Sequence, residues 1–185
     1  MVKNISKWSF LEPLLYQKES KHLAEISREL NKPHATVRKY LNEFEKQGLV
    51  TKQIKGRMTM YKLQLKNPSI IVYLTWIEKE RLAKVIHKDL LMKEIVYFLG
   101  EASGKILIFG SSVEGTKKAN DIDVILEGKI SSKSVKEFEK KFGVKFHIIN
   151  LKSLSDISET LKEEIINKHL IVQNSEEIIK WMLKN

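Results

Sequence analysis

The feature that most restricts the fold of this 185-residue chain is the stretch FGSSVEGTKKANDIDVIL, residues 109–126. The apolar segment GKILIFG leads into it and DIDVIL closes it, so the pattern predicts two short strands around a polar loop. Side chains alternate between the two faces of a strand, so Asp121 and Asp123 should share one face while Ile122 and Val124 enter the core. Two neighbouring carboxylates cost free energy unless a cation lies between them, which indicates a metal site.

The loop after the first strand opens with Gly110, Ser111 and Ser112. Glycine lets the backbone approach a ligand closely, and serine hydroxyls together with the N-terminus of a following helix can hold phosphate oxygens. Next to paired carboxylates, such a turn is typical of half of a magnesium–nucleotide site.

This stretch resembles the active-site motif of the minimal nucleotidyltransferases, members of the DNA polymerase β-like superfamily. Their motif is a hydrophobic residue, Gly, then Ser or Gly, followed later by an acidic–hydrophobic–acidic triplet. The resemblance extends over approximately residues 90–185 and includes HLIVQNSEEIIKWM as a closing strand and helix. It implies a small mixed sheet flanked by helices, catalytic and metal-ligand roles for Asp121 and Asp123, and triphosphate contacts for Gly110 and Ser111, with a further hydrogen bond from Ser112. The implied cofactor is Mg²⁺ or Mn²⁺, with a nucleoside triphosphate such as ATP as substrate or ligand.

The chain departs from the family pattern at the third carboxylate, which belongs on a later strand. The matching strand is VKFHIINL, where the acidic position is taken by His147, with Lys145 on the same face. A neutral imidazole brings no negative charge and suits magnesium poorly, and a lysine repels a second cation. An acid from elsewhere, such as Glu114 or Asp156, is the alternative. Whether the domain is an enzyme therefore stays open at this point.

The first third of the chain has the pattern of three helices followed by a hairpin. Apolar residues recur at helical spacing in residues 8–15, 23–30 and 33–47, and the period then changes to two on either side of Lys55-Gly56-Arg57. This region, approximately residues 5–66, resembles the winged helix-turn-helix domains of bacterial and archaeal transcription regulators. The resemblance implies that the third helix lies in the DNA major groove. The residues expected to contact double-stranded DNA are His34, Thr36, Arg38, Lys39 and Asn42 on that helix and Lys55 and Arg57 on the wing.

The distribution of charge agrees with a polyanionic partner. The net charge of the whole chain is +10, and residues 1–67 hold 14 Lys and Arg against 6 Asp and Glu, a net of +8. Such an excess is the electrostatic footprint of nucleic-acid binding. The alternatives are a solvated lysine-rich surface and a winged helix that binds protein instead of DNA.

A helical connector is predicted between the two regions, as one long helix or two consecutive ones. The expected fold is therefore α+β: a winged helix-turn-helix over 1–67, a connector over 68–89 and a nucleotidyltransferase-like domain over 90–185. The connector is too apolar for a free linker, which favours packing on a neighbouring domain or a homodimer.

Composition excludes several classes of protein. Cysteine is absent, so disulfides, thiolate catalysis and cysteine-based zinc sites are excluded, and a cytoplasmic location without membrane contact is expected. Two functions remain. The first is a DNA-binding nucleotidyltransferase that transfers a nucleotidyl group to a protein or RNA hydroxyl; resemblance adds a small helical partner protein and a toxin–antitoxin setting. The alternative is a transcription regulator whose degenerate nucleotidyltransferase domain serves nucleotide sensing or dimerisation.

Overall fold

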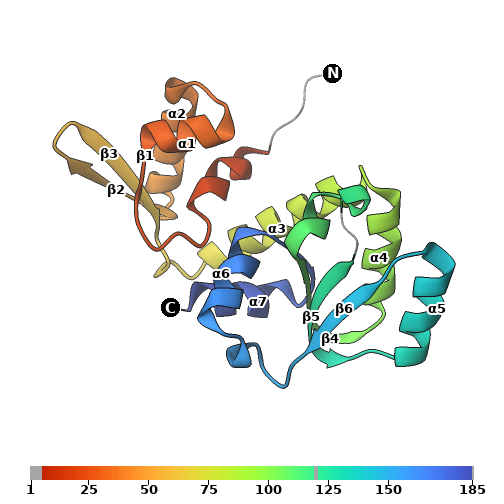
Figure 1. Cartoon of the computed structure of the whole chain (residues 1–185). Helices are drawn as coiled ribbons and strands as arrows, with labels where there is room; N and C mark the ends of the chain where they lie inside the picture. Colours follow the sequence, from red (N-terminus) through yellow and green to blue (C-terminus); the bar gives the residue numbers. More distant parts are fainter. Residues whose placement is uncertain (1–5, 119–120, 185) are drawn as a thin grey trace. The chain divides into compact units, whose positions relative to one another are not determined.

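The computed structural model describes residues 6–118 and 121–184. The predicted domains 1–67 and 90–185 include residues 1–5 and 185, which lie outside the described residues. Positions 119–120, inside the Gly-Ser-Ser to Asp-Ile-Asp motif, also lie outside them. The fold is mixed α+β, as the sequence predicts (Figure 1). The chain divides into two compact units, Met1–Ile77 and Glu78–Asn185, and the boundary falls within helix α3 (Ile70–Ile86).

The first unit is a small helical domain closed by a sheet. Its elements in order are a 3₁₀ helix Lys7–Leu14, β1 Lys21–His22, α1 Leu23–Leu30, α2 His34–Lys46, β2 Val50–Lys55, β3 Met58–Leu63 and the first part of α3. The strands form an antiparallel sheet in the order β1-β3-β2. The first predicted helix is thus a 3₁₀ helix instead of an α-helix, and it contains Pro13, which has no N–H to donate to an α-helical ladder.

Helices α1 and α2 are joined by a tight turn. Asn31 adopts a left-handed conformation (φ 50°) and ends α1, and α2 starts at His34. At the other end of α1, His22 is the N-cap: its side chain accepts from the amide of Ala24 while Glu25 accepts from the amide of His22. These local interactions fix where α1 begins and ends, and they give His22 a structural role.

The core of the first unit is formed by the residues that the helical periodicity selects. Val37, Leu41 and Phe44, the residues at helical spacing within the predicted helix 33–47, are fully buried on α2. Trp8 stacks on Phe44 with ring centroids 5.5 Å apart, and it also contacts Tyr73 of α3 at 4.4 Å. Burial of these rings anchors the 3₁₀ helix and the start of α3 on the face of α2 that points away from solvent.

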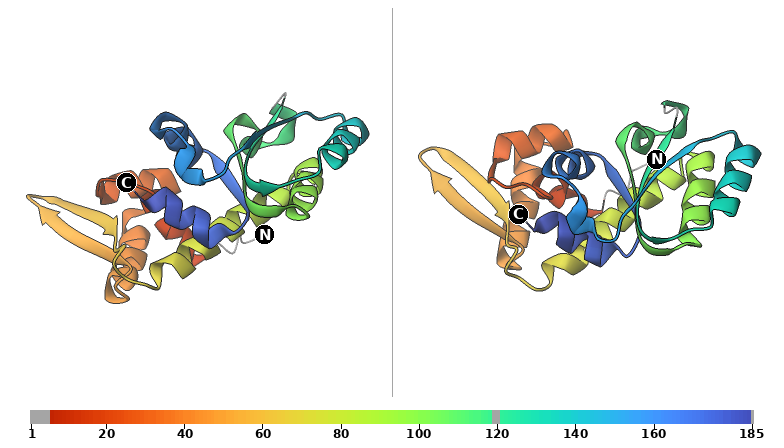
Figure 2. Two further views of the ribbon diagram at one scale, coloured as in Figure 1. Left: turned by 90° about the horizontal axis from the view of Figure 1, so that it is seen from below. Right: turned by 60° about the horizontal axis from the view of Figure 1, so that its bottom comes forward.

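The second unit is a four-stranded sheet covered on both faces. It contains the rest of α3, α4 Leu90–Gly100, β4 Ser103–Phe109, β5 Ile122–Lys129, α5 Ser132–Phe142, β6 Phe146–Asn150, α6 Glu159–Asn167, β7 His169–Gln173 and α7 Ser175–Leu183, with short 3₁₀ helices at Gly110–Glu114, Thr116–Lys118 and Leu154–Asp156. The strand order is β6-β5-β4-β7, with β5 and β6 parallel and the other pairs antiparallel. Helices α4 and α5 lie on one side of the sheet and α6 and α7 on the other (Figures 1 and 2).

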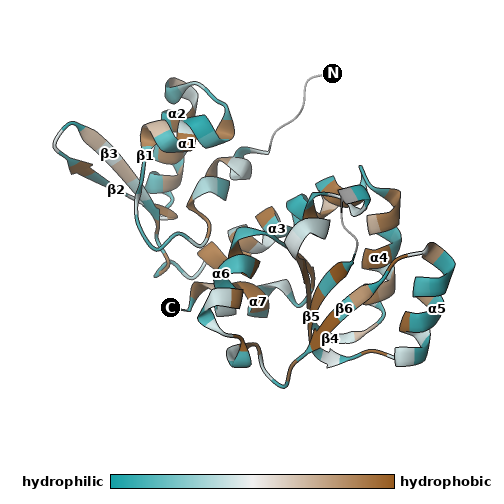
Figure 3. Ribbon diagram, in the orientation of Figure 1, coloured by the Kyte–Doolittle hydropathy of each residue, from teal (hydrophilic) through white to brown (hydrophobic). Residues whose placement is uncertain are grey.

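Alternation along the central strands builds the two faces of this sheet. Ile122 and Val124 of β5 join Ile106 and Ile108 of β4 in the core that packs on α4, as predicted for β5. The central strands are accordingly among the most apolar segments of the unit (Figure 3). Asp123, between the two buried β5 residues, must point to the opposite face.

Two glycines fix the register of β4 against β5. Gly104 and Gly128 are opposite each other, and a Cβ on either would collide with the backbone of the other strand, at Glu127 or Ser103. Next to them Lys105 is paired with Glu127, which also accepts from the amide of Leu154 at 2.7 Å. Burial raises the pKa of Glu127, but the hydrogen bonds from Lys105 and Leu154 and the lysine charge outweigh it, so this pKa lies below its ordinary value.

Asp89 separates α3 from α4 and also holds the loop that follows β4. Its carboxylate caps α4 by accepting from the amide of Met92 at 3.0 Å, and it accepts from the amide and hydroxyl of Thr116, both at 2.8 Å. Burial acts to raise the pKa of Asp89, but these hydrogen bonds, with one from the amide of Leu91, hold the pKa below its ordinary value. The predicted connector, residues 68–89, therefore contains one helix, α3, and a second helix, α4, follows it. The capping aspartate ties the junction of these two helices to the loop between the two motif halves.

The substitution Asp89→Ala should destabilise the second unit by about 1–2 kcal/mol, because it removes a helix cap and leaves the Thr116 amide without its acceptor. Chemical unfolding followed by circular dichroism measures this, with the exposed neighbour Lys88→Ala as a matched control expected within about 0.5 kcal/mol of wild type.

The pKa of Asp89 is lower in the folded than in the unfolded chain, so its ionisation stabilises the fold above the unfolded pKa. That contribution disappears as the pH falls through the folded value, and the gap between wild type and Asp89→Ala should narrow below about pH 4. A gap that stays constant down to acid unfolding would contradict this role for the carboxylate.

Candidate functional site

The two halves of the Gly-Ser-Ser to Asp-Ile-Asp motif meet at one end of the sheet. Phe109, the last residue of β4, is paired with Asp123 on β5 and with His169 on β7. Gly110 follows with φ +74°, and a Cβ added there would lie 2.9 Å from Oδ2 of Asp123. Only glycine fits both the left-handed conformation and this close approach. The motif glycine therefore lets the turn lie directly against the aspartate.

His147 occupies the position next to Asp123 on the parallel strand β6, the strand that the sequence analysis matched to the third carboxylate. The two residues are in register, and Nδ1 of His147 lies 3.1 Å from Oδ1 of Asp123. The His147 side chain is 66% exposed and that of Asp123 is 30% exposed, so the pair is accessible from solvent. An imidazole thus contacts the aspartate where a third acid is expected in the family motif. The side chain of Lys145, just before β6, is not part of the Asp123–His147 contact. The backbone carbonyl of Lys145 accepts a hydrogen bond from the amide of Ile122.

The other predicted ligand residues lie around this pair in different environments. Asp121 is exposed and precedes β5 in a bend, so the strand alternation predicted for it begins one residue later. Ser111 is exposed at the start of the turn. Ser112 is fully buried and its hydroxyl donates to the carbonyl of Phe109 at 3.3 Å, so in this conformation it stabilises the turn. The segment Gly110–Glu114 is a five-residue 3₁₀ helix, too short to supply the helix N-terminus that the sequence analysis expected.

The two acids named as alternatives for the third carboxylate have other partners. Glu114 forms an ion pair with Lys168 at 2.9 Å, and Asp156 accepts from the amide of Ser153 at 3.1 Å in a capping box. Within the described residues, no group of three His, Cys, Asp or Glu side chains is arranged to hold a metal ion. In this conformation Asp123 and His147 are in contact, and among the described residues no third such side chain, Asp121 included, joins them in an arrangement that could hold a metal ion.

A buried polar group, which the sequence analysis did not find, lies behind the turn. His169 at the start of β7 is fully buried; its Nδ1 lies 2.8 Å from the carbonyl of Ile165 and its Nε2 lies 3.4 Å from Glu78 of α3. Glu78 is 1% exposed and is also bound by Arg81 at 3.1 Å. The amide of Gly110 donates to the carbonyl of Lys168, the residue before His169. A glutamate and a histidine inside apolar runs were the only sequence signal for this group.

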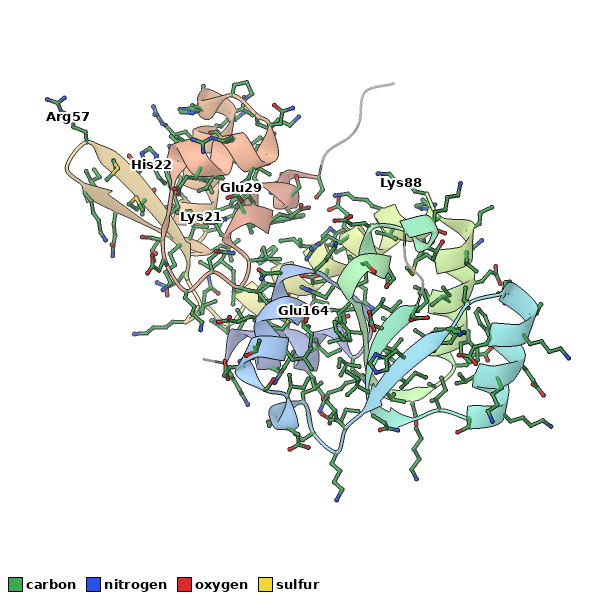
Figure 4. The ribbon with its side chains drawn as sticks, in the orientation of Figure 1. Lys21, His22, Glu29, Arg57, Lys88 and Glu164 are labelled. Carbon is green, nitrogen blue, oxygen red and sulfur yellow. The ribbon has the colours of Figure 1, made fainter. Side chains whose placement is uncertain are left out.

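The predicted DNA-contacting residues form an exposed surface on α2 and the β2–β3 hairpin. On α2, His34, Arg38 and Lys39 are exposed and Thr36 and Asn42 are partly buried. Asn42 lies 3.5 Å from Nζ of Lys52 on β2, which connects the helix to the hairpin. Lys55 and Arg57 lie at the exposed hairpin tip, where Gly56 has φ +60° (Figure 4). Two large apolar side chains, Ile54 (74% exposed) and Met58 (50% exposed), lie beside these cations.

Comparison with known proteins does not assign a function to this chain. No family model matches the sequence, and no curated protein matches it. Among solved structures the chain is similar to one described as the crystal structure of T. acidophilum IdeR, with 16% sequence identity and a TM-score of 0.38. The alignment covers 77% of this chain and 56% of that chain. At this TM-score the likeness says nothing about what the chain does. Among the described helices, none is both long and apolar enough to cross a membrane.

The close approach of Gly110 to Asp123 can be tested with a matched pair of glycine substitutions. Gly143 ends α5 with φ +67° and has no atom within 4 Å of a built Cβ, so Gly143→Ala should cost about 1 kcal/mol for backbone strain alone. Gly110→Ala should cost at least about 1 kcal/mol more, because the methyl group also displaces the Asp123 carboxylate from His147.

Combining Gly110→Ala with Asp123→Ala in a double-mutant cycle should recover this excess. Urea titration gives the unfolding free energy of the wild type, of each single variant and of the double variant. Equal costs for the two glycine substitutions would show that the turn does not lie against the aspartate.

Proposed function

We propose that this protein is a DNA-binding regulator whose second unit is a degenerate nucleotidyltransferase domain that binds a metal–nucleotide. The observation that carries the second part is the contact between His147 and Asp123 at 3.1 Å. It fills the position of the third acid in the family motif with a group that brings no negative charge in its neutral form. A site with two carboxylates retains ligands for one cation and loses the base for an acceptor hydroxyl.

The first unit supports DNA binding through its shape and its charge. Two helices joined by a tight turn and followed by a hairpin have the order of a winged helix-turn-helix, which supports α2 as the recognition helix in this proposal. Its exposed cations lie on α2 and at the hairpin tip, within the third of the chain that carries a net charge of +8. In the proposal, α2 reads base edges through Arg38 and its neighbours, while Lys55 and Arg57 contact phosphates.

The proposed ligand of the second unit is a nucleoside triphosphate with Mg²⁺ or Mn²⁺. Carboxylate oxygens are the donors that both ions accept, and Asp121 and Asp123 supply them at the exposed end of β5. The bound cation would neutralise phosphate charge between the aspartates and the ligand. Ser111 is exposed for a phosphate oxygen, whereas Ser112 and the amide of Gly110 are already used inside the protein.

A nucleotidyltransferase that acts on a protein or RNA hydroxyl is the second candidate. The observation that favours it is the glycine turn held against an aspartate, because the turn of the family motif grips the triphosphate there. It requires an additional carboxylate near His147, or catalysis without one. A homodimer through α3, where Val72 and Trp76 are exposed one turn apart, belongs to the same proposal for either candidate.

The double substitution Lys55→Ala/Arg57→Ala should weaken binding to a random-sequence DNA duplex and flatten its salt dependence. Removing two phosphate contacts lowers the slope of log K against log salt by about 2. Fluorescence anisotropy between about 50 and 200 mM salt, where two lost contacts change the affinity measurably, gives both quantities. Lys133→Ala/Lys136→Ala removes the same charge from exposed positions on α5 and should leave the slope unchanged. An equal change in both variants would mean that net charge, and not the hairpin, determines binding.

Calorimetric titration with ATP and Mn²⁺ should show binding that falls at least about tenfold in Asp121→Ala/Asp123→Ala, because the cation loses both carboxylates. Asp156→Ala, an acid used for capping, is the matched control and should bind normally.

His147→Asp restores a third carboxylate and should raise pyrophosphate release from a very low level if the histidine is what disables transfer. Fast pyrophosphate release by the wild type that depends on both aspartates would favour the nucleotidyltransferase over the regulator as the function of this protein. Wild type that binds no nucleotide would remove the ligand proposal while leaving DNA binding untouched.

A further inference from the structure

A groove unrelated to either proposed site lies between α4 and α5, the two helices that cover one face of the sheet in the second unit. Its volume is about 360 Å³ and both helices line it along their lengths. The two helices lie side by side in every view (Figures 1 and 2). α5 has no fully buried residue, so its inner face is only partly covered.

The floor of the groove is aromatic. Phe98 of α4 stacks on Phe138 of α5 with centroids 4.5 Å apart, and Phe138 stacks on Phe142 at 4.4 Å. Tyr97 lines the same groove and is 64% exposed. Large aromatic surfaces left partly open to water are the usual anchoring sites of protein interfaces.

The rim of the groove is acidic, in a chain with a net charge of +10. Glu94, Glu101 and Glu137 line it and are exposed, and Lys141 is the lysine of the lining. Glu137 already has a cationic neighbour in Lys133 at 4.0 Å, so Glu94 and Glu101 carry the acidic character of the rim. The ring faces also attract ammonium groups: Lys141 lies 5.0 Å from the ring centroid of Phe142 and Lys93 lies 5.7 Å from that of Tyr97. A cationic, partly apolar occupant is therefore complementary to both the floor and the rim.

The spacing of the lining residues fits a helix as the occupant. On α4 they lie at positions 94, 97, 98 and 101, and on α5 at 134, 137, 138, 141 and 142. Both sets follow the i, i+3, i+4, i+7 pattern of one helix face. Two such faces side by side leave a seam into which a third helix packs by ridges and grooves.

We propose that the α4–α5 groove binds an amphipathic helix of a partner protein, with apolar side chains on the aromatic floor and Lys or Arg opposite Glu94 and Glu101. A second copy of this chain fits less well. On helices, the exposed large apolar side chains among the described residues are Val72 and Trp76 on α3 and Leu90 and Tyr97 on α4 itself. The α3 face continues into Glu80, which is ion-paired with Lys84 at 3.2 Å, so this part of the face brings no excess of positive charge to the acidic rim.

The test uses the full chain and a fluorescein-labelled peptide of about 16 residues, long enough for helix formation on contact. The peptide carries Leu and Phe on one face and Lys on the other, and a control peptide keeps the apolar face with Glu in place of Lys. Anisotropy at low salt should show that the basic peptide binds at least about tenfold more tightly than the acidic one. Circular dichroism should show helix gained on binding.

Glu94→Gln/Glu101→Gln should weaken binding of the basic peptide at least about fivefold and leave the acidic peptide unaffected or bound more tightly. Glu159→Gln/Glu164→Gln removes two exposed carboxylates from α6 and should leave the affinity for both peptides unchanged. Equal binding of both peptides, no binding, or no effect of the groove substitutions would overturn the proposal. So would sedimentation showing a dimer that the basic peptide disrupts and the groove substitutions abolish, since a second copy would then be the occupant.

Discussion

The antiparallel pairing of β4 with β5 is the constraint on which the second unit depends. Gly104 and Gly128 fix its register at one end, since a side chain on either would collide with the opposite backbone. At the other end the same register brings Phe109 opposite Asp123 and lets Gly110 turn against the carboxylate. A slip of one residue would send Asp123 into the apolar core beside α4 and bring Ile122 to the site. The packing of the core and the geometry of the candidate site are therefore two results of one strand register.

This register also explains how far the sequence analysis could go. Strict alternation in the β5 segment predicts that Ile122 and Val124 are buried, and the structure confirms it. The family resemblance matches His147 in VKFHIINL to the third acidic position, and the parallel pairing of β6 with β5 puts His147 beside Asp123. Asp121 is predicted on the strand but precedes it. Alternation alone does not tell where the first hydrogen bond between the strands forms, so it does not locate the end of a strand. The burial of Ser112 depends on the tertiary environment of the turn and has no local signal.

The features that the sequence did not predict are interactions between distant segments. Asp89 reads as a break between helices, but its bond to Thr116 joins residues 27 positions apart. Glu78 and His169 are 91 positions apart in the sequence and meet only because α3 runs along β7. In the first unit, helical spacing correctly gave α2, whereas the segment around Pro13 became a 3₁₀ helix because proline cannot complete an α-helical ladder. Periodicity therefore predicts the helices and strands and their buried faces. Which charged side chains from distant segments pair with each other can be seen only in the three-dimensional structure.

The central claim is that the turn at Gly110 and the carboxylate of Asp123 together form a place for a cation and phosphates. Paramagnetic broadening by Mn²⁺ in the presence of ATP, followed by nuclear magnetic resonance, tests it directly because the effect falls steeply with distance. The account predicts that the amide signal of Gly110 and the ring signals of His147 broaden at low Mn²⁺, before that of Gly143 at the end of α5. Broadening that begins elsewhere, or that affects all three residues equally, would contradict it.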